Sequence, residues 1–269
     1  MKLCMGCMSH IACEDITICP VCGYDNSEIN NKKEYHLPTK TRLCKKRFNV
    51  GRVIGEGGFG IVYLVFDRKD GQRKAIKEYF PQKFANRSPG NPTVLINEGQ
   101  KRKFEFYKDK FKKEAEFLKK YNNFNVSKIF NMNNTVYYVM DYIDGTNLLN
   151  YAKKNGCNDK LSLVKTLELL QPVKQVLSRL HSDNYLHRDI DPKNIVVEED
   201  GTTHLLDFGS VGKVGDLSHS WKPGYAAIEQ YGTDDENKYK KFGNEGVETD
   251  IYQLAATIYT IITGKKPPG

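Results

Sequence analysis

The sequence predicts an α+β protein, with a strand-rich first half and a helical second half, preceded by a short cysteine-rich module. Three observations carry this prediction. Residues 50–66 alternate apolar side chains around a Gly-rich turn, as two antiparallel strands joined by a hairpin do. Apolar residues recur at helical spacing from Leu163 to Leu180, and another helix is expected over 250–263. Two Cys-x-x-Cys pairs lie close together at the N-terminus.

The composition is that of a folded protein. The chain has 269 residues, of which 39% belong to the set AVILMFWYC, and 41 Lys and Arg against 33 Asp and Glu give a net charge of +8. This apolar content excludes a wholly disordered chain. The sequence contains no apolar run of membrane-spanning length and begins without the apolar centre of a signal peptide, which predicts a soluble, cytoplasmic protein. Scattered Lys residues indicate a solvated surface and argue against a nucleic-acid partner.

The N-terminal cysteines have the spacing of a metal site. Cys4 and Cys7 form one pair, and Cys19 and Cys22 form the other. Two thiolates that are two residues apart can reach one ion from a tight turn, and two such turns complete a tetrahedral zinc site. Because four thiolates leave no open position, this Zn²⁺ would be structural. We therefore expect residues 1–24 to form a zinc ribbon.

Three alternatives to zinc remain. Disulfides would need an oxidising compartment, which the missing signal peptide argues against. A redox Cys-x-x-Cys is usually a single motif near a βαβ unit. Cys13 could replace one ligand, although it has no partner at the same spacing. Residues 25–47 are rich in Asn, Lys, Ser and Thr and are expected to form a linker to a second domain.

The Gly-rich turn is a candidate phosphate-binding loop, because glycines let backbone N–H groups approach phosphate oxygens. Its glycines are Gly55, Gly57, Gly58 and Gly60. The Rossmann fingerprint has the same G-x-G-x-x-G spacing but continues into a helix, whereas here a β-branched strand follows. The next strand ends at Lys77, whose ammonium group could reach phosphates under the loop; a plain surface lysine is the alternative.

Three further motifs resemble those of the protein-kinase family. Residues 187–194 read HRDIDPKN, which is similar to H-R-D-L-x-x-x-N. Residues 207–209 supply D-F-G, and Ala-Ile-Glu at 227–229 stands where A-P-E is expected. With the Gly-rich loop and Lys77 in the correct order, residues 48–269 resemble bacterial eukaryotic-like Ser/Thr protein kinases.

The resemblance implies a bilobal kinase fold. Residues 48–143 would form a β-rich N-lobe with an insertion near 82–108, because the link from Lys77 to the next helix is long. Residues 144–269 would form a partial, helical C-lobe that is truncated after its central helix.

The resemblance also implies residue roles in a reaction that uses ATP and Mg²⁺. Asp189 would accept or orient the proton of the attacking hydroxyl, and Lys193 would steady the γ-phosphate. Lys77 would hold the α- and β-phosphates and pair with Glu114, whereas Glu116 is the alternative partner. Oxygen ligands suit Mg²⁺. The ligands implied are Asn194 and Asp207.

The adenine would lie between apolar side chains of both lobes and bond to the backbone of the hinge. Met140, at the end of a buried strand, resembles the gatekeeper, although core filling explains it equally. The adenine-binding residues implied are Val62, Ala75, Met140, Asp141, Ile143 and Val196.

The segment after D-F-G is short, and Arg188 could pair with a phosphate on it. Candidate phosphorylation sites are Ser210, Ser218 and Ser220; the alternative is a loop that is ordered without phosphorylation. We expect an active Ser/Thr protein kinase acting on protein substrates, itself included. The alternatives are a nucleotide-binding pseudokinase or scaffold with a truncated C-lobe, a small-molecule kinase, and a zinc-ribbon nucleic-acid binder.

Overall fold

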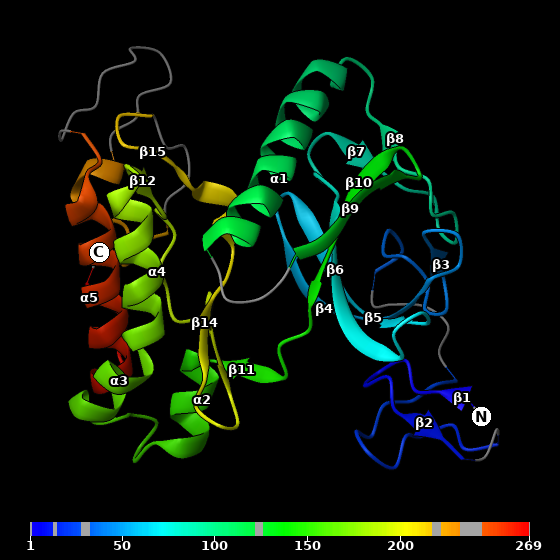
Figure 1. Ribbon diagram of the computed structural model, residues 1–269, viewed down its shortest axis with the longest axis horizontal. Coiled ribbons are helices and arrows are strands. Elements are labelled where there is room, and N and C mark those ends of the chain that lie inside the picture. Colours follow the sequence, from blue (N-terminus) through cyan, green and yellow to red (C-terminus); the bar gives the residue numbers. More distant parts are fainter. Residues whose placement is uncertain are drawn as a thin grey trace. The chain divides into compact units, whose positions relative to one another are not determined.

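The chain forms two compact units. The structure is a computed structural model that describes residues 2–12, 15–27, 33–121, 126–216, 222–231 and 244–268. The first unit comprises Met1–Glu116 and Asn125–Tyr142, and the second comprises Phe117–Phe124 and Ile143–Gly269 (Figure 1). No helix in these described ranges combines the length and the apolar character needed to cross a bilayer.

An antiparallel six-stranded sheet is the centre of the first unit. Its strand order is β3-β4-β5-β6-β10-β9. The strands are β3 (Arg42–Leu43), β4 (Phe48–Gly57), β5 (Gly60–Asp67), β6 (Gln72–Tyr79), β9 (Val126–Met132) and β10 (Thr135–Asp141). The turns between strands contain residues that tolerate a positive φ. Gly71 adopts a φ of +67° between β5 and β6, and Asn133 and Asn134 adopt left-handed φ values between β9 and β10.

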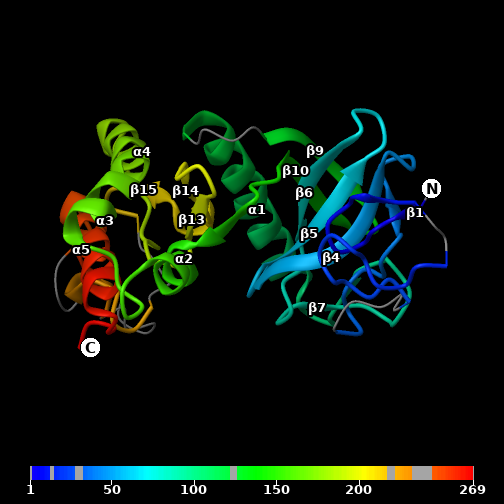
Figure 2. The ribbon, with the colours of Figure 1, turned by 90° about the horizontal axis from the view of Figure 1, so that it is seen from below.

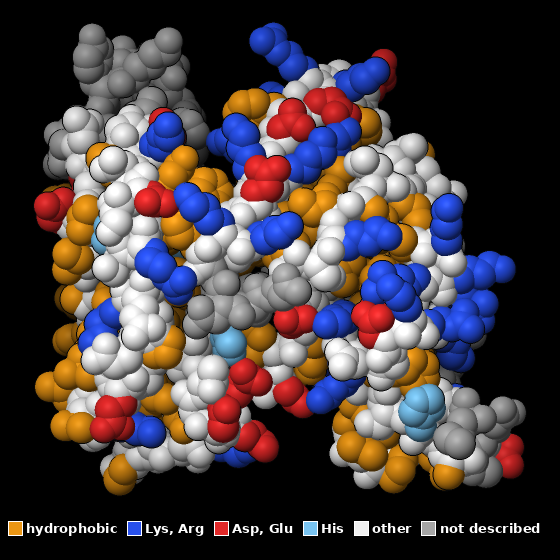
Figure 3. All heavy atoms as spheres, viewed as in Figure 1, with side chains coloured by type: hydrophobic (Ala, Val, Ile, Leu, Met, Phe, Trp, Pro, Cys, Tyr) orange, Lys and Arg blue, Asp and Glu red, His pale blue; other side chains and the backbone are white. Residues whose placement is uncertain are grey.

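Helix α1 (Lys101–Tyr121) packs against this sheet through aromatic side chains. Phe111 lies 5.0 Å from the ring of Tyr138 on β10, and Phe104 lies 4.9 Å from the ring of Tyr79 on β6. On the face shown in Figure 3, basic and acidic side chains are interspersed over α1. The helix is therefore amphipathic, and its outer face is a mixed, solvated surface.

The segment before α1 is anchored by a buried ion pair. Arg87 and Glu78 side chains are both fully buried and paired. The hydroxyls of Tyr63 and Tyr137 also donate to Glu78. Strands β7 (Ala85–Asn86) and β8 (Leu95–Ile96) pair in the same segment. The insertion that the sequence predicts near 82–108 is therefore shorter in the structure, because α1 already begins at Lys101.

Residues 33–47, which the sequence predicts to be part of a linker, are instead packed into the first unit. Leu37 and Leu43 are fully buried, and β3 extends the sheet by pairing with β4. Arg47 forms a bidentate pair with Asp67, with N–O distances of 2.8 and 2.6 Å. The few apolar residues of this stretch are widely spaced, which is why its composition resembles that of a linker.

The N-terminal module lies against strands β4 and β5 (Figure 2). It contains the short strands β1 (Lys2–Leu3) and β2 (His10–Ile11). Met5 and Met8 are buried in one cluster with Leu64 of β5. The Arg52 N–H donates to Met5 O at 2.8 Å, and Arg52 Nε donates to Gly6 O at 2.7 Å. The module and the sheet therefore share a core.

The second unit is mainly helical. Its helices are α2 (Leu148–Asn155), α3 (Leu163–Leu169), α4 (Gln171–Ser182) and α5 (Val247–Thr263). Helix α3 ends and α4 begins around Leu170, and Pro172 lies in the first turn of α4, where no intrahelical N–H bond is needed. The sheet β11-β13-β14 consists of Gly145–Asn147, Ile195–Glu198 and Thr203–Leu205. A two-stranded sheet joins β12 (Tyr185–Leu186) to β15 (Gly212–Lys213), and short 3₁₀ turns cover Phe208–Ser210 and Ile228–Gln230.

Candidate functional site

Lys77 on β6 pairs with Glu114 on α1. The distance from Lys77 Nζ to Glu114 Oε1 is 2.6 Å, and Tyr138 Oη donates to the same oxygen at 3.0 Å. The Glu114 side chain is 5% exposed, whereas Glu116 is exposed. The fold therefore holds the Lys77 ammonium group between the sheet and the helix, with a buried carboxylate as its counter-ion.

The Gly-rich turn joins β4 and β5, and there is free space next to its backbone at Gly57 and Gly58. A Cβ atom placed on Gly57 or Gly58 would meet nothing within 4 Å. A Cβ on Gly60 would lie 2.7 Å from the carbonyl oxygen of Glu78, so no larger residue fits there. The loop thus has open space at Gly57 and Gly58 and lies close to β6 at Gly60, which suits a phosphate-binding loop.

Side chains from residues 33–36 bind Glu56 in this loop, a contact that the sequence did not suggest. Tyr35 Oη donates to Glu56 at 2.5 Å, Lys33 Nζ lies 3.0 Å away, and His36 Nε2 lies 3.3 Å away. Gln82 donates to the same carboxylate from the other side at 2.7 Å. Partial burial alone would raise the pKa of Glu56, but the hydrogen bonds from Tyr35 and Lys33 lower it overall.

In the second unit, α5 fixes the backbone of residues 187–194. The N–H groups of His187 and Arg188 donate to the two carboxylate oxygens of Asp250, each at 2.8 Å. The Ile190 N–H donates to Gln253 Oε1 at 2.9 Å. Asp250 and Gln253 are both buried. Fully buried acceptors on a helix therefore hold this loop by its main chain, as a rigid site requires.

The Asp189 carboxylate lies on this loop and is 12% exposed. Asn194 Nδ2 donates to Asp189 Oδ2 at 3.0 Å and to the Asp189 carbonyl oxygen at 2.9 Å. Burial raises the pKa of Asp189, and the ammonium group of Lys222 only partly offsets this effect. The structure thus brings the predicted base and one predicted Mg²⁺ ligand into direct contact.

Asp189 forms an ion pair with Lys222, a residue that the sequence analysis missed. Lys222 Nζ lies 2.8 Å from Asp189 Oδ1 and 2.6 Å from Asp191 Oδ2. Lys193 is exposed, and its backbone N–H donates to Asp191 Oδ1 at 2.6 Å. The two acidic residues two positions apart in HRDIDPKN were the available signal, because two neighbouring buried carboxylates need a cation.

Asp207 follows β14 in a left-handed conformation, with a φ of +61°. Phe208 is buried edge-on against His187, with ring centroids 5.0 Å apart. Burial lowers the pKa of His187, so this imidazole is a neutral packing partner. Asp207 itself is exposed. The turn therefore buries the aromatic ring and leaves the carboxylate near the surface, where it could ligate a cation.

The residues predicted to contact adenine divide between the two units. The first unit carries Val62, Ala75, Met140 and Asp141, and the second carries Ile143 and Val196. Ala75 and Met140 occupy paired positions on the adjacent strands β6 and β10. Asp141 forms an ion pair with Lys74, at 2.7 Å. Asp141 also lies opposite Lys74 in the β10–β6 ladder, so this ion pair joins neighbouring strands.

Arg188 is already paired with a carboxylate. Its Nε lies 2.6 Å from Glu245 Oε2, and both side chains are buried. Its Nη2 donates to the carbonyl oxygens of Lys213 and Asp216 at 2.9 and 2.8 Å. Ser210 lies half-buried in the first 3₁₀ turn. The other candidates, Ser218 and Ser220, lie outside the described residues.

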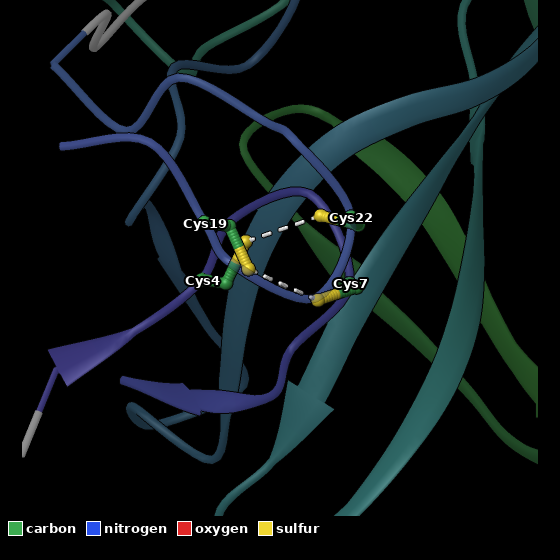
Figure 4. A group of neighbouring side chains, drawn as sticks. All are labelled: Cys4, Cys7, Cys19 and Cys22. Atoms are coloured by element: carbon green, nitrogen blue, oxygen red, sulfur yellow. Dashed lines mark hydrogen bonds between the residues drawn. The ribbon is translucent and has the colours of Figure 1, made fainter. Parts of the chain in front are cut away.

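The cysteine cluster gathers four sulfur atoms at one point (Figure 4). The Sγ atoms of Cys4, Cys7, Cys19 and Cys22 lie within 4.8 Å of one another. The Cys4–Cys22 and Cys7–Cys19 sulfur distances are 3.7 and 3.8 Å. Four sulfurs at about 2.3 Å from a tetrahedral Zn²⁺ would be about 3.8 Å apart. The four sulfur donors and the distances between them therefore fit a zinc ion. Cys13, the alternative ligand, lies outside the described residues.

The turns around the cluster direct backbone N–H groups at sulfur. The Gly6 N–H donates to Cys4 Sγ at 3.3 Å, and a Cβ on Gly6 would collide with Tyr24. Gly23 has a φ of +70°. Desolvation alone would raise the pKa of Cys19. Hydrogen bonds from the backbone N–H groups of Cys22 and Val21 instead lower the pKa of Cys19 to about 7. Desolvation and the neighbouring thiols raise the pKa of Cys22 to about 12. A bound dication would lower the pKa of Cys22, because a positive charge favours the thiolate form.

Comparison with known proteins identifies the fold. Residues 48–269 match the model of the protein kinase domain family, and the chain therefore belongs to this family. The two units have the architecture of a protein kinase fold, with a β-sheet N-lobe and a helical C-lobe. The class of protein is thus a protein kinase domain, and the curated relatives that it resembles include Ser/Thr-protein kinases.

Particular relatives agree with this class. The Ser/Thr-protein kinase PknA of Nostoc sp. is 26% identical over 84% of this chain and 38% of its own length. The probable Ser/Thr-protein kinase PknB of Bifidobacterium longum is 24% identical over 84% of this chain and 31% of its own length. The solved apo form of PpkA-294 is 31% identical, with a TM-score of 0.71 over 87% of this chain and 81% of that one. The chain thus spans about a third of the length of each of these two curated relatives.

Proposed function

We propose that this chain is an ATP- and Mg²⁺-dependent Ser/Thr protein kinase that transfers the γ-phosphoryl group to protein hydroxyls, its own included. One observation carries the proposal. The Asp189 carboxylate is held next to Asn194 on a loop whose main chain is fixed by buried Asp250. Such rigidity matters because phosphoryl transfer depends mainly on positioning and charge neutralisation.

The residues of the second unit would act on the attacking hydroxyl. Asp189 would accept its hydrogen bond and take its proton as the oxygen attacks phosphorus. Asn194 and Asp207 would hold Mg²⁺, since amide and carboxylate oxygens are the donors that this cation prefers. The bound metal would supply charge neutralisation at the phosphate oxygens. The left-handed turn at Asp207 keeps its carboxylate near the surface for this purpose.

The residues of the first unit would hold the nucleotide. Lys77 would bind the α- and β-phosphates, and Glu114 keeps the Lys77 ammonium group in place between β6 and α1. The open backbone at Gly57 and Gly58 would lie against the phosphates. A pseudokinase is not favoured, because the charged positions for catalysis are filled and the curated relatives are Ser/Thr kinases.

The test is transfer of label from γ-³²P-ATP with Mg²⁺ to the chain and to a Ser/Thr peptide library. Wild type should transfer phosphate, and Asp189→Asn and Asp207→Asn should each lose at least about 100-fold in rate. Asp159→Asn is the matched control, since Asp159 is an exposed turn residue. Equal rates in wild type and Asp189→Asn would disprove the proposal.

We also propose that residues 1–24 form a structural zinc ribbon. The sulfur spacing, the N–H bonds to sulfur and the shared core with β4 and β5 support it. Residues 25–47 would then connect the ribbon to an N-lobe over 48–143, and 144–269 would be C-lobe. Elemental analysis of the purified chain should give one Zn per molecule. A Cys4→Ser, Cys22→Ser variant that retained one Zn would contradict this assignment.

A further inference from the structure

We propose that Lys222 is a positioning residue for phosphoryl transfer, and that it holds the Asp189 carboxylate in the orientation that receives the substrate proton. The inference rests on the proposed kinase function and adds a residue to it. Lys222 comes from the segment between D-F-G and Ala227, about thirty residues after Asp189 in the chain. It belongs to the same unit as Asp189.

One ammonium group bridges two carboxylates. Lys222 Nζ lies 2.8 and 2.9 Å from the two oxygens of Asp189 and 2.6 Å from Oδ2 of Asp191. The side chains of Asp189 and Asp191 are 12% and 4% exposed. An ammonium group has three N–H donors, so it can bond to both carboxylates at once. Both acidic side chains are thereby oriented by a single cation.

The charge balance of the site requires such a cation. Two buried carboxylates two residues apart repel each other, and a buried charge without a partner is costly. Hydrogen bonds occupy other positions on both groups: Asn194 donates to Asp189 Oδ2, and the Lys193 N–H donates to Asp191 Oδ1. Asn194 is neutral and Lys193 contributes only its peptide group here. Among the described residues around Asp189, Lys222 therefore supplies the positive charge.

The backbone around Lys222 is itself anchored. The N–H groups of Tyr225 and Ala226 both donate to the Lys222 carbonyl oxygen at 3.0 Å. Tyr225 Oη bonds to Thr260 on α5 at 3.2 Å. Further along, Gln230 Nε2 donates to the Arg188 carbonyl oxygen, next to Asp189. Placement of the segment after D-F-G therefore determines where the ammonium group lies, and it couples that segment to the predicted base.

In the reaction, Lys222 keeps its proton. The hydroxyl O–H bond of the substrate breaks and its proton goes to Asp189, while the oxygen forms a bond to the γ-phosphorus. The bond from that phosphorus to the β,γ-bridging oxygen breaks, and ADP leaves with the electron pair. Lys222 orients the carboxylate throughout and offsets one of the two negative charges of the Asp189 and Asp191 pair.

The test compares Lys222→Gln and Lys222→Arg with wild type in the labelled-ATP assay. In Lys222→Gln, kcat should fall about 100-fold, as for a misplaced catalytic group, while the KM for ATP stays within about threefold. Lys222→Arg retains a positive charge and should recover a substantial part of kcat. Lys165→Gln is the matched control, since Lys165 is about half exposed on α3. Thermal melting of each variant checks that the fold is retained.

Three results would overturn the inference while leaving the kinase assignment intact. Unchanged kcat in Lys222→Gln would show that the bridge has no part in transfer, and a faster variant would show that the ammonium group blocks Asp189. Loss of kcat in Lys222→Gln without recovery in Lys222→Arg, together with a lowered melting temperature in both, would also contradict it. Wild type that binds ATP and transfers no phosphate would overturn the proposed function and this inference together.

Discussion

At the scale of single residues, the site depends on charges that are paired inside the protein. Lys77 on β6 is bound by Glu114, and Tyr138 donates to the same carboxylate oxygen. An amine on a flexible four-carbon chain loses conformational freedom when it binds phosphate, and the pair reduces that loss by holding the amine beforehand. Glu114 is therefore a positioning residue and Lys77 the phosphate ligand in the proposed reaction.

Lys77→Met should abolish phosphate transfer, with a loss of at least about 100-fold in kcat/KM, because the phosphates lose their cation. The fold should survive, since Met fills a similar volume. The measurement is label transfer together with far-UV circular dichroism. Lys69→Met is the control, because Lys69 lies exposed in the β5–β6 turn. Transfer in Lys77→Met at the rate of the control would contradict the assigned role.

Asp189 leads to a pH prediction. Burial raises the pKa of Asp189, although the ammonium group of Lys222 lowers it in part. The proposed base must be ionised, so kcat should fall as the pH drops through this raised pKa, above the usual Asp range near about 4. The measurement is kcat against pH for the folded chain. An acid limb at or below about pH 4 would be the contrary result.

At the scale of elements, α5 supports the site more than any other helix of the second unit. Its Asp250 and Gln253 accept three main-chain N–H groups of the loop that carries Asp189. His181 Nε2 also contacts Asp250, at 2.8 Å. A helix is a suitable support because it fixes both acceptors, one turn apart, on the same face.

Asp250→Ala should destabilise the chain by about 3 kcal/mol, because it leaves buried N–H groups without acceptors. Transfer should fall with it, since the loop loses its support. Chemical denaturation of Asp250→Ala and Glu248→Ala gives the comparison; Glu248 is acidic and exposed on the same helix. The control should change by less than about 0.5 kcal/mol. Equal midpoints in the two variants would refute the supporting role.

Residues 210–216, the described part of the segment after D-F-G, should keep their positions without phosphorylation. Arg188 is paired with buried Glu245 and bonded to two carbonyl oxygens of this segment. Glu245 thus supplies the negative charge that a phosphate would otherwise supply. Ser210→Ala and phosphatase-treated wild type should keep transfer within about twofold, whereas Glu245→Gln should lose about tenfold. Strong activation of the dephosphorylated chain by autophosphorylation would contradict this expectation.

At the scale of the whole molecule, the N-terminal module and the kinase domain are not independent. Met5 and Met8 of the module share a buried cluster with Leu64, and Arg52 bonds to two carbonyl oxygens of the module. Residues 33–36 then reach Glu56 in the Gly-rich loop. The module therefore contacts the N-lobe sheet, and the segment after it contacts the Gly-rich loop.

Removal of the metal should unfold the module and expose part of β4 and β5. Zinc binding contributes on the order of 10 kcal/mol to the folding of such short modules, so packing against Leu64 should not keep the module folded without it. After chelation, hydrogen exchange should accelerate at residues 2–12 and along β4, while α5 stays protected. Cys157→Ser is the control for thiol chemistry, because Cys157 is an exposed free cysteine. Unchanged exchange after chelation would mean that the metal has no structural role.

Motifs made of neighbouring residues could be predicted from the sequence. The Gly-rich hairpin and the paired cysteines follow from local backbone rules and ligand spacing, so they need no knowledge of distant contacts. Glu114 was also predicted as the partner of Lys77, through a family pattern in one helix. The roles of these residues in transfer remain predictions for the experiments above.

The sequence by itself determined the class of fold, the order of its motifs and the residues proposed for catalysis, because each depends on residues close together in the chain. Tertiary structure decided the rest. It packed residues 33–47 into the sheet, paired Glu245 with Arg188, and placed Lys222 on Asp189 and Asp191. These are contacts between distant segments, and they form because a buried charge or backbone group must find its partner wherever the fold places one.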